Sequence, residues 1–128
     1  MEGNTMSTRS NIIIQDGSDK FYIYRHSDGY PEGAGKDLKK FLAKDKYTHW
    51  DGSKLATNLV RLNEPTDYGF GPKDYYPYEI TTGVHGDIEY LYLITLTDTE
   101  SQLQCYKVVG WDAPEEDIIK EENLVEIP

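Results

Sequence analysis

The strongest strand pattern in this chain is the segment Ile88-Glu89-Tyr90-Leu91-Tyr92-Leu93-Ile94-Thr95-Leu96-Thr97. Alternate side chains of a strand point to opposite faces of a sheet, and apolar residues occur here in both alternating sets. One face is expected to carry Ile88, Tyr90, Tyr92, Ile94 and Leu96, and the other Leu91 and Leu93. A strand that is apolar on both faces is typical of the middle of a sheet. The sequence therefore predicts that residues 88–97 form a central strand.

Four shorter segments complete a predicted sheet of about five strands. Asn11–Gln15 and Phe21–His26 flank the turn Asp16-Gly17-Ser18-Asp19, a pattern that predicts a β-hairpin. Tyr78–Thr81 precedes the central strand and Gln102–Val109 follows it after a second turn. Consecutive strands joined by short turns pair antiparallel, so the sheet is expected to be mostly antiparallel.

Two helices are predicted between the hairpins. The first runs from about Glu32 to Lys44, and the second begins at Asp51 or Ser53 and ends near Leu62. Each has one apolar stripe with helical spacing, formed by Leu38, Phe41 and Leu42 in the first and by Leu55, Leu59 and Leu62 in the second. The fold class expected is α+β, with two helices packed on one face of the sheet.

The chain has 128 residues, the size of one domain. We expect an N-terminal extension over residues 1–10, a single domain over residues 11–111 and an acidic C-terminal tail over residues 112–128 with a short helix through Ile118 and Ile119. We expect the native start to be either Met1 or Met6. The tail holds seven acids and one lysine, whereas Lys36–Lys46 has a net charge of +3. The tail is expected to dock on this basic helix or, alternatively, to meet a basic partner.

The overall net charge of −10 excludes some partners. Binding to duplex nucleic acid requires clustered Lys and Arg, and an acidic chain is repelled by anionic membranes. No apolar run is long enough to span a bilayer and no signal peptide is visible, so a cytoplasmic location is expected. The single cysteine, Cys105, lies in an apolar run, is expected to be buried and cannot form an internal disulfide.

Two His-x-Asp elements are the sharpest chemical features: His26-x-Asp28 and His85-x-Asp87-x-Glu89. Both are predicted where a strand meets a turn. If the two turns lie at the same edge of the sheet, the imidazoles and carboxylates converge and suit Zn²⁺, Mn²⁺ or Fe²⁺, which would activate water. The alternatives are that the aspartates are ordinary turn residues and the histidines are structural, or that these groups act in acid–base chemistry without a metal.

Two other features are candidates for binding a small ligand. Gly33-Ala34-Gly35-Lys36 at a helix start resembles a phosphate cradle, to which Arg9, Arg25 and Lys36 would contribute, although it does not match a P-loop. The alternative is that the glycines make the first turn of the helix flexible enough to pack closely against the rest of the chain. The rings of the Asn63–Pro77 loop and Tyr78, with His49 and Trp50, form either a stacking pocket or anchors for the loop.

Three segments carry a family resemblance: Met6–Ile12, Tyr24–Gly33 and His85–Tyr92. Their motifs, STRSN-I, YRHSDGYPEG and HGDIEYLY, resemble those of a family of small uncharacterised proteins from bacteriophages and bacterial mobile elements, including those of gut Bacteroides. The resemblance implies an accessory protein of such an element, including one that acts on host defence. It implies no catalytic residue.

These patterns favour a binding protein over an enzyme. The predicted ligand-binding residues are Tyr24, Arg25, His26, Asp28, Tyr30, Lys36, Trp50, His85, Asp87 and Glu89. The expected partner is a host protein, whose basic surface would suit the acidic chain, or a small ligand such as a phosphorylated one. The alternative is a small metal-dependent hydrolase or phosphoesterase using His26, Asp28, His85 and Asp87, and a divalent metal is the one cofactor considered. A structural component is a third interpretation, and the oligomeric state is open.

Overall fold

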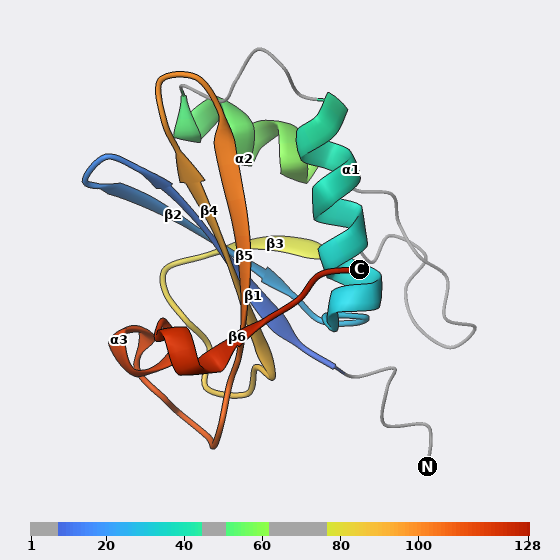
Figure 1. The fold of residues 1–128 in the computed structure, drawn as a ribbon, viewed down its shortest axis with the longest axis vertical. Helices are drawn as coiled ribbons and strands as arrows, with labels where there is room; N and C mark the ends of the chain where they lie inside the picture. The colour runs from blue at the N-terminus through green and yellow to red at the C-terminus, as the bar shows by residue number, and fades with distance from the viewer. Residues whose placement is uncertain (1–7, 45–50, 62–76) are drawn as a thin grey trace.

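A six-stranded sheet organises the computed structural model, which describes residues 8–44, 51–61 and 77–128. The strand order is β3-β2-β1-β4-β5-β6 (Figure 1). The strands are β1 Ser10–Asp16, β2 Asp19–Arg25, β3 Tyr78–Thr81, β4 Tyr90–Leu96, β5 Ser101–Lys107 and β6 Leu124–Val125. The predicted α+β class with a mostly antiparallel sheet is confirmed. The expected number of five strands was one too low, because residues of the tail form β6 beside β5.

The central pair of the sheet is β1 with β4, and it is parallel, whereas the four other pairings are antiparallel. The hairpin of β1 and β2 forms as predicted, with Gly17 adopting the positive φ of 62° that its turn requires. The segment 88–97 is central as predicted, although β4 itself begins at Tyr90. Ile12 pairs with Tyr92 in the register of β1 and β4.

Helices α1 (Lys36–Lys44) and α2 (Gly52–Arg61) cover one face of the sheet (Figure 1). The first predicted helix begins differently from expectation, because Pro31–Gly35 forms a π-helical turn, η2, before α1. Asp51 is the cap of α2: its Oδ1 accepts hydrogen bonds from the backbone N–H groups of Ser53 at 3.1 Å and Lys54 at 3.2 Å. Two further short helices, α3 (Glu115–Ile118) and the 3₁₀ turn η3 (Glu121–Asn123), lie in the tail.

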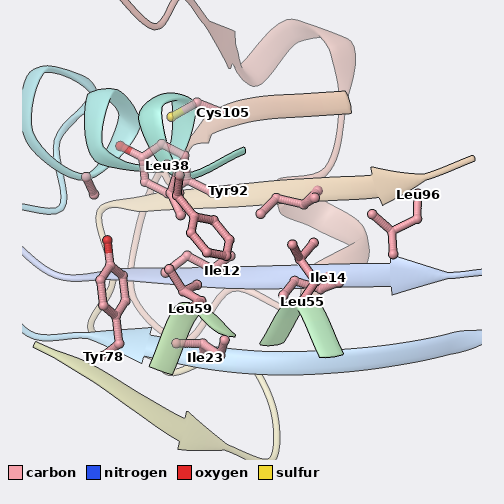
Figure 2. Packing of buried hydrophobic residues seen from close by; sticks show 13 residues of the cluster. Ile12, Ile14, Ile23, Leu38, Leu55, Leu59, Tyr78, Tyr92, Leu96 and Cys105 are labelled. Carbon is pink, nitrogen blue, oxygen red and sulfur yellow. The ribbon is translucent and has the colours of Figure 1, made fainter. Parts of the chain in front are cut away.

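The larger hydrophobic core fills the space between the sheet and the two helices. Figure 2 shows it as alternate residues of the strands that meet the apolar stripes of α1 and α2. Its buried members are Ile12, Ile14, Ile23, Ala34, Leu38, Phe41, Leu55, Leu59, Tyr78, Tyr92, Ile94, Leu96 and Cys105. The predicted stripes are therefore the buried faces of both helices, while Leu62 lies outside the described residues.

A second core covers the opposite face of the sheet. Its buried members are Ile13, Tyr24, Ile88, Leu91, Leu93, Tyr106, Val108 and Ile118. The prediction that Ile88 shares a face with Tyr92 was wrong. Ile88 lies between the turn at Gly86 and Asp87 and the start of β4, where strand alternation does not apply, and its side chain joins Leu91 and Leu93 instead. Ile118 of α3 is only 2% exposed, so the tail contributes to this core.

Polar side chains also join the tail to both β2 and α1. Glu115 lies 2.5 Å from Lys20 Nζ and accepts a hydrogen bond of 2.6 Å from the Tyr22 hydroxyl, which holds α3 against β2. At the C-terminus, Lys39 of α1 donates to the carbonyl oxygen of Ile127 at 3.0 Å. The end of the tail thus reaches the basic helix through main-chain oxygens of Ile127 and Pro128. The acidic side chain of Glu115 instead pairs with Lys20 of β2 on the other face of the sheet.

The described helices include none with the length and apolar character needed to cross a bilayer.

We predict that the Cys105 thiol is unreactive in the folded protein. It is 1% exposed, and burial raises its pKa to about 12, an effect that a hydrogen bond with Tyr92 offsets only in part. Ellman's reagent should therefore label Cys105 at neutral pH only after denaturant is added. Labelling of the native protein at the rate of a free thiol would contradict its placement in the core.

Glu115 should make the free energy of unfolding depend on acidic pH. Burial raises the pKa of Glu115, but the hydrogen bonds from Lys20 and Tyr22 and the charge of Lys20 outweigh it and leave the pKa below its ordinary value of 4.5. A carboxylate whose pKa is lowered by folding stabilises the protein above its unfolded pKa, and this contribution is lost as the pH falls through the folded pKa.

The Glu115→Gln variant should therefore lose less stability than the wild type when the pH is lowered below about 4.5, measured by urea unfolding at each pH. Glu116→Gln is the matched control, because Glu116 is an exposed acid of the same helix. If the two variants show the same acid dependence, Glu115 is not the group responsible.

Candidate functional site

The ring of Tyr24 is the meeting point of the two His-x-Asp elements. Tyr24 lies on β2 and is 3% exposed. Its ring stacks on His85 with centroids 3.8 Å apart, and His26 approaches it edge-on at 4.6 Å. The Tyr24 hydroxyl lies 2.9 and 3.1 Å from the carboxylate oxygens of Asp87 and donates to this group. The two turns are thus brought together at one end of the strands, where β1 and β4 begin and β2 ends.

Buried Asn11 fixes the turn that carries His85. Asn11 lies on β1 and has no exposed surface. Its side-chain amide donates to the carbonyl of Ile23 at 3.0 Å and to that of Gly83 at 3.4 Å, and its oxygen accepts from the backbone N–H of His85 at 2.7 Å. Other arrangements are disfavoured, because they would leave this buried amide without its partners. Asn11 therefore positions the turn against β1 and β2.

Further contacts orient each of the two imidazoles. His85 Nε2 lies 2.8 Å from the Thr81 hydroxyl, and His26 Nε2 contacts the carboxylate of Glu79. Both partners belong to β3, the strand at the edge of the described sheet. The histidines are thus held by hydrogen-bonding groups and by the Tyr24 ring, an arrangement that suits a structural role.

The four predicted metal-binding residues do not form a ligand set. His26 meets Glu79, Asp28 lies 3.2 Å from the Tyr30 hydroxyl, and Asp87 meets Tyr24. No group of three or more His, Cys, Asp or Glu side chains able to hold a metal ion occurs in residues 8–44, 51–61 and 77–128. The geometry therefore gives no support to metal-dependent hydrolysis.

Arg25 lies away from the Tyr24 cluster, on the helix-covered face. It is buried, donates to the Ser27 carbonyl at 2.7 Å and to the Tyr78 hydroxyl at 2.6 Å, and pairs with Asp37 at 3.1 Å. These contacts tie the end of β2 to α1 and β3. Arg25 is thus a buried structural residue in this fold.

The predicted phosphate cradle has a packing role instead. The N–H of Gly33 donates to the carbonyl of Tyr30 at 2.9 Å and that of Ala34 to the carbonyl of Asp28 at 2.8 Å. A Cβ atom on Gly33 would lie 2.5 Å from the Asp28 carbonyl oxygen, so close packing explains the glycine. Lys36 is exposed at the start of α1. Trp50 and the loop residues 63–76 lie outside the described residues.

A groove of about 420 Å³ opens beside the Tyr24 cluster. Asp87 belongs to both, because it accepts from Tyr24 and lines the groove. The other lining residues come from the start of β1, the turn before β4 and the segment after β5: Arg9, Ile88, Glu89, Val108, Gly110 and Trp111. Arg9 Nε lies 3.3 Å from Asp87 Oδ2 inside this groove.

Trp111 is the most prominent apolar side chain of the groove. It is 79% exposed, and Val109, two residues earlier, is 77% exposed. The turn that presents Trp111 is held in place: Gly110 and Asp112 have positive φ values of 91° and 56°, and the Asp112 N–H donates to the Gly86 carbonyl at 3.0 Å. A Cβ atom on Gly86 would lie 1.9 Å from Asp112 Oδ1, so this turn packs directly on the turn of His85.

Two residues that define this region, Asn11 and Trp111, were not predicted as part of a site. Asn11 stands directly before three isoleucines of a predicted strand, and a polar residue in such a run is a signal for a buried hydrogen-bonding side chain. Trp111 follows Gly110 just after the last predicted strand of the domain. Neither a periodic pattern nor a motif distinguishes an exposed tryptophan from a buried one.

Comparisons with protein-family models, with curated proteins and with solved structures found no match to this chain.

We predict that Asn11→Ala lowers the free energy of unfolding by about 3 kcal/mol, because it leaves buried backbone groups without partners and creates a cavity. Urea unfolding would measure the loss, with Gln102→Ala as the control because Gln102 is exposed on β5. A loss as small as that of the control would mean that the Asn11 hydrogen bonds do not hold the turn.

Proposed function

We propose that this protein is a binding protein that docks a basic segment of a partner protein in the groove beside Trp111. The observation that carries the proposal is the 79% exposure of Trp111 on a turn of fixed backbone. Tryptophan is enriched among the residues that dominate the energy of protein interfaces. An exposed tryptophan costs free energy in water, and a partner that covers it recovers that cost.

The fixed backbone around the groove favours binding. The turn of Trp111 is hydrogen-bonded to that of Gly86, and the turn of Gly86 is held by Asn11. A surface that is already ordered loses little conformational entropy when a partner binds. The Tyr24 cluster contributes to this order by fixing Asp87 in the groove wall.

The charge of the chain supports a basic partner. The net charge is −10, and Asp87 and Glu89 stand in the groove with one cation, Arg9. Complementary charge raises the association rate and discriminates against acidic partners. The resemblance to phage and mobile-element proteins makes a host protein in the cytoplasm the proposed partner, such as one whose basic surface normally holds nucleic acid.

We predict that Trp111→Ala weakens binding of hexa-arginine amide, a minimal basic segment, by about tenfold, equivalent to about 1.4 kcal/mol. Isothermal titration calorimetry would measure the affinity at low and at high salt, and binding should weaken as salt screens the charges. Ile80→Ala is the matched control, because Ile80 is 80% exposed on β3 and does not line this groove. Equal affinity of the wild type and Trp111→Ala would overturn the proposed function.

A further inference from the structure

We propose that the groove recognises an arginine side chain of the partner, with its guanidinium group on the Glu89 carboxylate and against the Trp111 ring. We further propose that Arg9 competes with this arginine for the acidic wall of the groove. The inference rests on the proposed function and specifies the chemistry of the segment that docks. The two carboxylates of the groove differ in their partners. Asp87 pairs with Arg9, whereas Glu89 has no side-chain partner among the described residues.

Asp87 already has a guanidinium partner. Arg9 lines the groove and its Nε lies 3.3 Å from Asp87 Oδ2, with both side chains partly exposed. The hydroxyl of Tyr24 holds the same carboxylate from behind at 2.9 Å. The chain's own Arg9 thus demonstrates that a guanidinium group fits in this groove beside a carboxylate.

Glu89 stands in the same groove without such a partner. Its backbone is fixed, because its N–H donates to the Arg9 carbonyl at 2.8 Å and its carbonyl accepts from the Val108 N–H at 2.9 Å. Its side chain is exposed and forms no ion pair or hydrogen bond with another side chain in the described part of the chain. A carboxylate on a fixed backbone beside an exposed aromatic ring offers a cation two complementary contacts.

These contacts favour arginine over lysine. A guanidinium group is planar, is weakly hydrated, stacks on aromatic rings and pairs with a carboxylate through two parallel hydrogen bonds. An ammonium group is strongly hydrated and acts as a point charge, so it gains less from the ring of Trp111.

Two other occupants are disfavoured by charge. A second copy of this chain would bring another net charge of −10 against the groove, and nucleic acid would bring phosphates against Asp87 and Glu89. A basic protein segment has the opposite charge and supplies a guanidinium group for Glu89. The groove therefore suits an arginine-bearing segment of a protein partner.

The test compares three peptide amides of equal length: hexa-arginine, hexa-lysine and hexa-citrulline, the last a neutral analogue of arginine. Titration of ¹⁵N-labelled protein, followed by NMR, gives each affinity and locates binding through the Trp111 indole and the Glu89 amide. Hexa-arginine should bind severalfold more tightly than hexa-lysine, and hexa-citrulline should bind weakest, because only arginine combines charge with a planar group.

Three variants separate the groove from general electrostatics. Glu89→Gln should weaken binding of hexa-arginine by about tenfold, whereas Glu122→Gln, the same charge change at an exposed site in η3, should leave it nearly unchanged. Arg9→Gln should strengthen binding severalfold, because it frees Asp87 for the peptide.

Equal affinity for hexa-arginine and hexa-lysine, equal effects of Glu89→Gln and Glu122→Gln, or weaker binding by Arg9→Gln would each overturn the inference. In those cases, loss of binding by Trp111→Ala would still support the proposed function. Failure of hexa-arginine to perturb Trp111 at all would overturn both.

Discussion

The parallel pairing of β1 with β4 determines where every element of the candidate site lies. Because these strands run in the same direction, the start of β4 stands beside the start of β1. The antiparallel neighbours β2 and β5 then bring their C-terminal ends to this same end of the sheet. Arg9, Tyr24, Asp87 and Trp111 come from four separate segments, and this one pairing assembles them. The site is thus a consequence of sheet topology rather than of any local motif.

Polar groups buried beside the smaller core hold this end together. Asn11 and Tyr24 are neighbours across β1 and β2, and both use polar atoms on the turn before β4. A buried polar group left without a partner costs more than its hydrogen bonds return, so alternative positions of the turn are penalised. The two histidines extend the same network to β3. In this structure they act as supports, which explains why imidazoles and carboxylates converge without forming a metal site among the described residues.

Much of the fold followed from local patterns. Alternation of apolar residues predicted the strands, helical spacing predicted the buried faces of α1 and α2, and turn residues predicted the hairpins. Contacts between segments far apart in the chain were harder to predict from the sequence. The pairing of β6 with β5 joins two residues of an acidic tail to the sheet, and a two-residue strand has no periodicity to detect. Ile88 was assigned to the wrong face because it precedes β4, where the alternation of a strand does not yet apply.

The candidate site was predictable only in part, for a related reason. The motifs identified Tyr24, His26, His85, Asp87 and Glu89, and the structure brings all of them to one end of the sheet. Arg25 and Lys36 were predicted to contribute to a phosphate cradle, yet alternation turns Arg25 to the opposite face from Tyr24. The exposure of Trp111 depends on the hydrogen bond from the Asp112 N–H to the Gly86 carbonyl, a contact between residues far apart in the chain.

The site consists of buried residues that fix the backbone and exposed residues that face solvent. Tyr24 and Asn11 are buried and fully engaged, so they are poorly suited to meet a ligand. Glu89 and Trp111 project from backbone that this buried network fixes, and they remain exposed. Ordered backbone beneath an exposed charge and an exposed ring favours the proposed binding, because little conformational entropy would be lost when a partner binds. The groups that converge on Tyr24, by contrast, are occupied with one another.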